Sequence, residues 1–70
     1  MMSKTVTAEY LAGIREGRDW FKRYGMEDAQ ANLDNLTRTA RMFDAQNPVG
    51  QMLRGERDFW RNQIKKGNSK

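Results

Sequence analysis

The residue types that most often carry catalysis are nearly absent from this 70-residue chain. It contains no His and no Cys, and its two Ser residues, Ser3 and Ser69, lie close to the ends. The common arrangements for general acid–base and nucleophilic catalysis are therefore excluded. Glu27 and Asp28 are adjacent carboxylates, but acidic residues at the start of a helix explain them more simply. We predict a protein that is not an enzyme and that uses no metal or cofactor.

A row of cations is the candidate nucleic-acid contact. Arg54, Arg57, Arg61 and Lys65 follow 3-4-4 spacing, which puts them on one side of a helix, and Lys66 extends the row. Like charges four residues apart repel one another, and phosphates or acidic side chains of a partner would relieve the repulsion. Residues suited to base edges are sparse on this side, so phosphate contact is a better hypothesis than sequence-specific reading. A solvent-exposed row moderated by a neighbouring carboxylate stays open as the alternative.

Large apolar residues supply a second candidate surface. The chain has two Trp, two Tyr and three Phe, and most should be core because rings at helical spacing usually are. Trp20 and Met42 fall outside the apolar stripes of their helices, so we expect both to be partly exposed. With Met52, Phe59 and Trp60 they form a candidate protein interface, in which Trp and Arg are typical hot-spot residues. Scattered exposed apolar residues are also ordinary on monomers, and both interpretations stay open.

Helices must position these side chains, because apolar residues recur at helical spacing in three segments separated by Gly or Pro. The first segment covers about residues 8–24, with Thr7 as N-cap and Gly25 as its stop. The second covers about 27–45. The third starts at Asn47-Pro48 and covers about 48–66, with Gly67 as its stop. The apolar stripes are Tyr10, Ile14, Gly17, Phe21 and Tyr24 in the first segment and Ala29, Leu33, Leu36, Ala40 and Phe43 in the second.

The short link between the first two segments predicts an antiparallel helical hairpin. Small residues would let its two backbones approach closely: Gly13, Gly17, Ala29 and Ala40. The third helix carries two apolar strips, one of Val49, Leu53, Trp60 and Ile64 and one of Met52 and Phe59. Either both belong to one broad buried face, or one faces the hairpin and the other a second molecule. On the outer side of the second helix we expect an ion pair between Asp34 and Arg38.

Length and charge limit the class of protein further. The chain holds one domain, residues 1–70, which is marginally stable alone, so self-association is expected; residues 1–6 and 67–70 are expected to be flexible. The net charge of +4 comes from four lysines near the ends, because residues 5–64 carry nine basic and nine acidic groups. The sequence has neither a membrane-spanning apolar run nor the apolar stretch of a signal peptide. We therefore expect a cytoplasmic protein.

Residues 9–21, EYLAGIREGRDWF, resemble the first helix of short early-region proteins of lambdoid phages and prophages, encoded between the exonuclease and excisionase genes. The resemblance covers this one helix and transfers no functional residue. It implies a small helical accessory factor that biases the choice between lysis and lysogeny or redirects host machinery.

These observations together predict an all-α protein of three helices: the hairpin of residues 8–24 and 27–45, plus the helix of residues 48–66. We expect a homodimer in the cytoplasm of a bacterial host cell, acting by stoichiometric binding to a host or phage protein and not at a membrane. The alternative is a weak DNA-binding regulator that uses the arginine row.

Overall fold

The computed structural model describes residues 7–44 and 46–68, and these residues form three helices and no strand. α1 covers Ala8–Tyr24, α2 covers Ala29–Ala40 and α3 covers Pro48–Asn68. The prediction of an all-α fold with three helices is confirmed. Residues 1–6, 69 and 70, for which flexibility was predicted, lie outside the described residues.

Both ends of α1 follow the predicted signals. The Thr7 hydroxyl oxygen accepts a hydrogen bond from the backbone N–H of Tyr10 at 3.1 Å, which satisfies one of the free N–H groups of the first turn. At the other end Gly25 has a φ of 68°, and its N–H donates to the carbonyl oxygen of Phe21 at 2.8 Å. A positive φ is easily reached only by glycine, so Gly25 ends α1 and redirects the chain towards α2.

α2 is shorter than the predicted range of 27–45 at both ends. Residues 25–28 form a turn, so Glu27 and Asp28 precede the helix instead of opening it, and the Asp28 side chain makes no capping hydrogen bond. Near the C-terminus the hydroxyls of Thr37 and Thr39 donate to the carbonyl oxygens four residues earlier, at 2.7 and 2.8 Å. Such bonds weaken and bend a helix. After α2 the backbone forms a tighter turn, in which the Met42 N–H donates to the carbonyl oxygen of Thr39, three residues earlier.

α3 begins as predicted and ends slightly later. The Asn47 side-chain oxygen accepts from the backbone N–H of Val49 at 2.9 Å, and Pro48 is the first helical residue. The helix continues through Gly67 to Asn68, which corrects the predicted stop at Gly67. The reason is that Gly67 does not take the positive φ that ends a helix at glycine; among the described residues only Gly25 does so.

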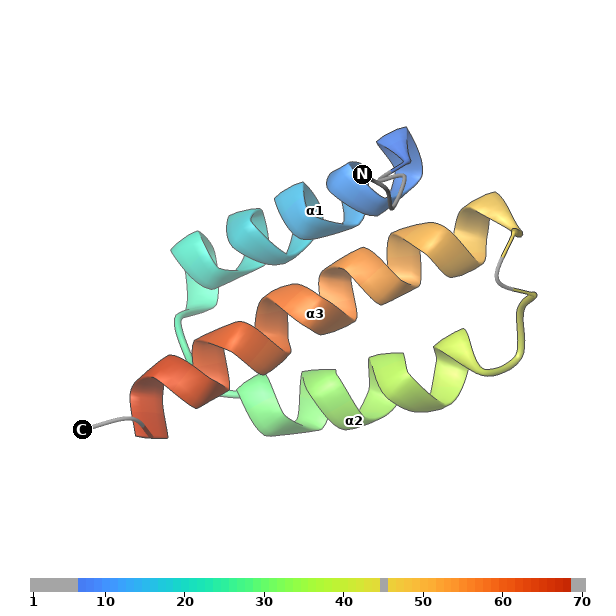
Figure 1. Ribbon diagram of the computed structural model, residues 1–70. Coiled ribbons are helices and arrows are strands. Elements are labelled where there is room, and N and C mark those ends of the chain that lie inside the picture. Colours follow the sequence, from blue (N-terminus) through green and yellow to red (C-terminus); the bar gives the residue numbers. More distant parts are fainter. Residues whose placement is uncertain (1–6, 45, 69–70) are drawn as a thin grey trace, which may run out of the picture.

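α3 lies between α1 and α2, and both pack on it (Figure 1). α1 runs in the same direction as α3, and α2 runs in the opposite direction (Figure 1). α1 and α2 are therefore antiparallel, as predicted, but among the described residues their backbones do not approach each other closely. The predicted direct packing within the hairpin is wrong, because α3 takes the place between the two helices.

Glycine makes the contact between α1 and α3 possible. A Cβ on Gly13 would collide with the carbonyl oxygen of Met52, and a Cβ on Gly55 would collide with the carbonyl oxygen of Tyr10. Each helix thus presents a residue without a side chain to the backbone of the other. The role predicted for Gly13 in close approach is confirmed, but its neighbour is α3, and Gly55 is an unpredicted partner.

The core forms around the aromatic residues of α1 and α3. Phe21, Phe59 and Trp60 meet edge to face, with ring centroids 5.4–6.2 Å apart. This geometry suits the charge distribution of aromatic rings. The buried Trp60 indole N–H has no hydrogen-bond partner among the described residues. α3 has one neighbour on each side, which accounts for apolar residues on two sides of this helix, but Val49 and Met52 of the two strips are exposed.

Candidate functional site

The five residues predicted for a protein interface divide into exposed and buried positions. Trp20, Met42 and Met52 are exposed, with 78% of the Met42 surface accessible, and the predicted exposure of Trp20 and Met42 is confirmed. Trp60 is 1% exposed and Phe59 is half-buried beside it. Trp60 must therefore be removed from the candidate interface, because packing between the helices covers its ring completely.

An exposed pair of aromatic residues lies in the second half of α1. The rings of Trp20 and Tyr24 are tilted against each other with centroids 4.6 Å apart, yet 44% of Trp20 and 53% of Tyr24 are accessible to solvent. Tyr24 was expected on the buried stripe of α1. It instead packs on Trp20, at the end of the helix, and Met26 in the following turn is also exposed. We call Trp20 and Tyr24 the aromatic pair.

Two members of the predicted arginine row are engaged within the chain. Arg54 donates to the carbonyl oxygens of Phe43 and Asp44, at 3.3 and 3.5 Å, and so holds the segment that follows α2. Arg57 donates to Asp58 through Nε at 3.0 Å, and its Nη2 lies 2.9 Å from the same carboxylate oxygen. Neither guanidinium is free in the way that a phosphate-binding row requires.

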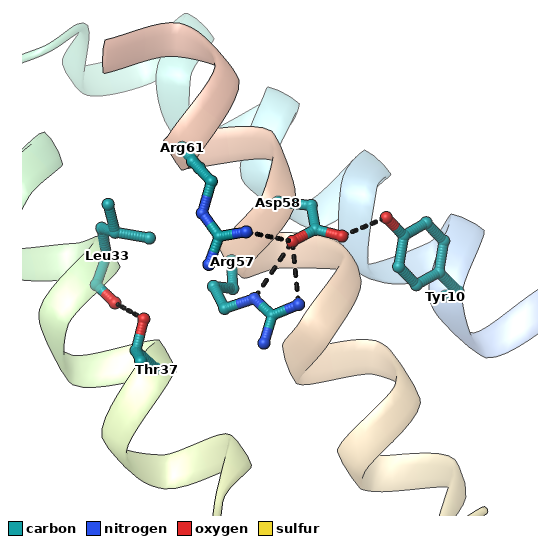
Figure 2. A network of polar contacts seen from close by, with 6 residues as sticks. All are labelled: Tyr10, Leu33, Thr37, Arg57, Asp58 and Arg61. Atoms are coloured by element: carbon teal, nitrogen blue, oxygen red, sulfur yellow. Dashed lines mark hydrogen bonds and ion pairs between the residues drawn. The ribbon is translucent and has the colours of Figure 1, made fainter. Parts of the chain in front are cut away.

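Asp58 is the centre of this polar network (Figure 2). One carboxylate oxygen receives Arg57 and lies 3.7 Å from Arg61 Nη1, and the other accepts a hydrogen bond from the Tyr10 hydroxyl of α1. This hydrogen bond raises the pKa of Tyr10, with further contributions from burial and from the Asp58 charge, whereas Arg57 and Arg61 oppose the shift. The network joins α1 to α3 and neutralises part of the basic row.

The remaining cations of the row are more exposed than Arg54 and Arg57. Lys65 and Lys66 are exposed in the last part of α3, where positive charge is favourable to the helix dipole. Arg61 is more than half exposed and reaches towards α2. Of the five basic residues predicted for nucleic-acid contact, these three remain accessible to a ligand.

Arg61 lines a basic groove between α2 and α3 that sequence reasoning missed. The groove has a volume of about 290 Å³. Its lining residues are Leu33, Asp34, Thr37, Arg38, Arg41 and Arg61. The predicted Asp34–Arg38 ion pair does not form among the described residues; Asp34 instead accepts a hydrogen bond from the Gln30 side chain at 3.0 Å. Helical spacing could not reveal the groove, because its cations come from two helices far apart in the sequence.

A second, smaller groove is lined by residues of all three helices. Its volume is about 120 Å³. The lining residues are Trp20 of α1, Asn32, Asn35 and Leu36 of α2, and Glu56 of α3. The Glu56 carboxylate has neither an ion pair nor a side-chain hydrogen bond with any described residue. Burial raises the pKa of Glu56, and the charge of Glu16 raises it further. In the sequence Glu56 falls between the two apolar strips of α3, but this position does not indicate a groove.

Comparison of the chain with family models, with curated proteins and with solved structures found no match. Across residues 7–44 and 46–68, no group of three or more carboxylate, His or Cys residues is arranged to hold a metal ion. Within the same part of the chain, every helix is too short or too polar to cross a membrane.

Proposed function

We propose that this protein is a small accessory or regulatory protein that acts by stoichiometric binding to a protein partner. The observation that supports this most is the aromatic pair, Trp20 and Tyr24, whose tilted rings meet on the surface of α1 and are about half exposed. Tryptophan and tyrosine are enriched among the residues that dominate binding energy at interfaces. The basic residues nearest the groove between α2 and α3 would then orient the partner.

The exposed surface of the pair is large enough to matter for binding. Each large aromatic side chain can bury about 150–250 Å². Because roughly half of each ring is exposed, a partner that covers both removes on the order of 200 Å² from water, worth about 5 kcal/mol before the costs of association.

The same surface supports self-association. The apolar side chains that are fully buried among the described residues are Ala29, Ala40 and Trp60, which is a small core for a chain of this length. A homodimer that covers the aromatic pair would add to this core. In line with the resemblance of α1 to short phage early-region proteins, we place the protein in the cytoplasm of a bacterial host cell, with a host or phage protein as partner.

One observation favours the alternative of a weak DNA-binding regulator. Arg38 and Arg41 have no ion pair with a described residue and face the same groove as Arg61. However, the groove also contains Asp34, and Asp58 lies close to Arg61, so carboxylates interrupt the positive surface. The negative charges of Asp34 and Asp58 would repel a phosphate backbone. We therefore rank protein binding first.

The test is capture of partners from a bacterial lysate by the immobilised protein, with quantification of each captured protein by mass spectrometry. The variant Trp20→Ala/Tyr24→Ala removes the aromatic pair. The control Leu11→Ala/Val49→Ala removes two apolar side chains of similar exposure elsewhere on the surface. We expect at least one protein to be captured by the wild type and the control but lost with the first variant. Equal capture by both variants would contradict the proposal.

Salt separates the two functions. Binding centred on aromatic residues should change little as the salt concentration rises, whereas phosphate contacts lose affinity steeply because each neutralised phosphate releases a counterion. Sedimentation equilibrium at low and high salt, with and without a DNA duplex, measures both dimerisation and DNA binding. A salt-sensitive complex with DNA that Arg38→Glu/Arg41→Glu abolishes would move the function to the alternative.

A further inference from the structure

The smaller groove has the composition of a binding site for a cation. Glu56 supplies a negative charge to the lining of the groove, and Glu16 is the charged neighbour that acts on Glu56. No cation of the described residues pairs with Glu56. A half-buried carboxylate without a counter-charge has lost part of its hydration and gained no ion pair, which is unfavourable for the folded chain. A ligand with positive charge would restore that balance.

The rest of the lining defines the shape of the cation. Trp20 offers an aromatic surface, which attracts both alkyl chains and cations, and Leu36 offers an apolar one. Asn32 and Asn35 contribute side-chain amides, whose oxygens accept hydrogen bonds. The carboxylate and two amides can provide three acceptors, and an ammonium group has three donors. The volume of about 120 Å³ accommodates one side chain and not a folded segment.

We propose that this groove receives one lysine side chain of a protein partner, with the alkyl chain against Trp20 and Leu36 and the ammonium group at Glu56. Trp20 belongs both to the groove and to the aromatic pair, so the lysine and the apolar contact lie on one continuous surface. The inference rests on the proposed function, because it names a chemical feature of the same partner. A compact ammonium suits the site better than the wide planar guanidinium of arginine.

The experiment is a titration of the ¹⁵N-labelled protein with Nα-acetyl-lysine methylamide, followed by NMR. The chain contains two Trp residues, so two indole N–H signals are observed: Trp20 reports on the groove, and the buried Trp60 serves as an internal reference. We expect the Trp20 signal and the side-chain amides of Asn32 and Asn35 to shift saturably while the Trp60 signal stays in place. Nα-acetyl-norleucine methylamide, which has a similar alkyl chain and no charge, should give no comparable shift.

Variants identify the charged group. Glu56→Gln keeps the shape of the side chain and removes its charge, so the affinity for the lysine probe should fall on the order of tenfold, as expected for the loss of a charged hydrogen bond. The control Glu27→Gln removes an exposed carboxylate outside the groove and should leave the affinity unchanged. Because removal of an unpaired half-buried charge should stabilise the fold, weaker binding by Glu56→Gln cannot be attributed to unfolding.

Three results would overturn the proposal. Equal shifts with the norleucine probe would show an apolar pocket without charge recognition. Unchanged affinity in Glu56→Gln would remove the carboxylate from the site, and tighter binding of Nα-acetyl-arginine methylamide would replace lysine by arginine as the occupant. The lysate experiment can fail while the lysine titration succeeds. Equal capture by both lysate variants, together with saturable lysine binding, would contradict the proposed partner surface and leave the cation site in place.

Discussion

The contact between α1 and α3 can be tested by adding a single methyl group to α3. In Gly55→Ala the new Cβ would collide with the carbonyl oxygen of Tyr10, and it would lie 3.2 Å from the backbone nitrogen of Ile14. These are backbone atoms of a helix, which cannot move aside as the end of a flexible side chain can. The methyl group is accommodated only if the backbones of α1 and α3 move apart at this contact.

The size of the effect follows from two opposing contributions. Alanine is favoured over glycine inside a helix by about 1 kcal/mol, which would stabilise the variant. Overpacking by one methyl group costs about 1–3 kcal/mol, and the rigid surroundings put this site at or beyond the upper end. We expect a net loss of about 2 kcal/mol in the free energy of unfolding. In a domain of this size, that corresponds to a fall in Tm of about 10 °C.

The assay is urea unfolding followed by far-UV circular dichroism, with Gly67→Ala on the same helix as the matched control. A Cβ on Gly67 meets only the flexible end of Met26, at 3.8 Å, so this variant should be as stable as the wild type or slightly more stable. Equal or higher stability of Gly55→Ala would refute the close contact between the two helices. A lower denaturant slope would show a change in the compactness of one of the states instead of a simple loss of stability.

Three further predictions concern the caps and the titrating groups. Thr7→Ala removes the N-cap hydrogen bond of α1 and should lower the free energy of unfolding by about 1 kcal/mol, whereas Thr7→Ser should retain it. Burial raises the pKa of Glu56 in the folded chain, so the stability that this side chain contributes is complete below the unfolded pKa and is lost as the pH rises through the folded pKa. Glu56→Gln should therefore be more stable than the wild type near pH 7. The difference in stability should be smaller at acidic pH. The pKa of Tyr10 is also raised, so its effect on stability has the same direction at alkaline pH. The free energy of unfolding should fall as the pH rises above about 10, and Tyr10→Phe should reduce this fall.

Thermal unfolding at a series of pH values checks the two titration predictions. The groups that bear on Glu56 are Glu16 of α1 and the neutral Asn32 and Asn35 of α2, so Glu16→Gln should produce a smaller gain of the same sign. A Glu56→Gln variant that is less stable than the wild type near pH 7 would indicate that the carboxylate has a stabilising partner. For Tyr10→Phe, an alkaline stability profile identical to that of the wild type would assign the loss to other groups.

Both ends of α1 and the start of α3 could be predicted from the sequence because their signals are local. Thr7, Gly25 and Asn47 each act on backbone groups within four residues, and all three have the predicted roles. The ends of α2 were placed too far out, since apolar spacing continues to Phe43 although the threonine hydroxyls near its C-terminus weaken the helix. The role of Gly55 was missed, because a glycine in a helix does not reveal which backbone lies against it.

The candidate site was less predictable because it depends on which helix lies beside which. The exposure of Trp20 and Met42 followed from their positions outside the stripes. Trp60 was misplaced because α3 has neighbours on both sides, which leaves its ring no free surface. The arginine row was read as one surface, whereas Arg54 binds carbonyl oxygens that the fold brings to it from the segment after α2. Arg57 pairs with Asp58, the neighbouring carboxylate of the alternative interpretation. The two grooves combine residues of different helices and have no signature in linear spacing.

The central position of α3 has a consequence for folding during synthesis on the ribosome. α1 and α2 leave the ribosome before α3, but each finds its packing surface on α3. Short isolated helices are marginal in water, so the nascent chain gains its tertiary structure only when α3 has emerged. A chain interrupted before residue 48 would lack the common partner of both helices and would be a substrate for chaperones and proteases. Protection of the nascent α1 and α2 from quality control therefore depends on completion of α3.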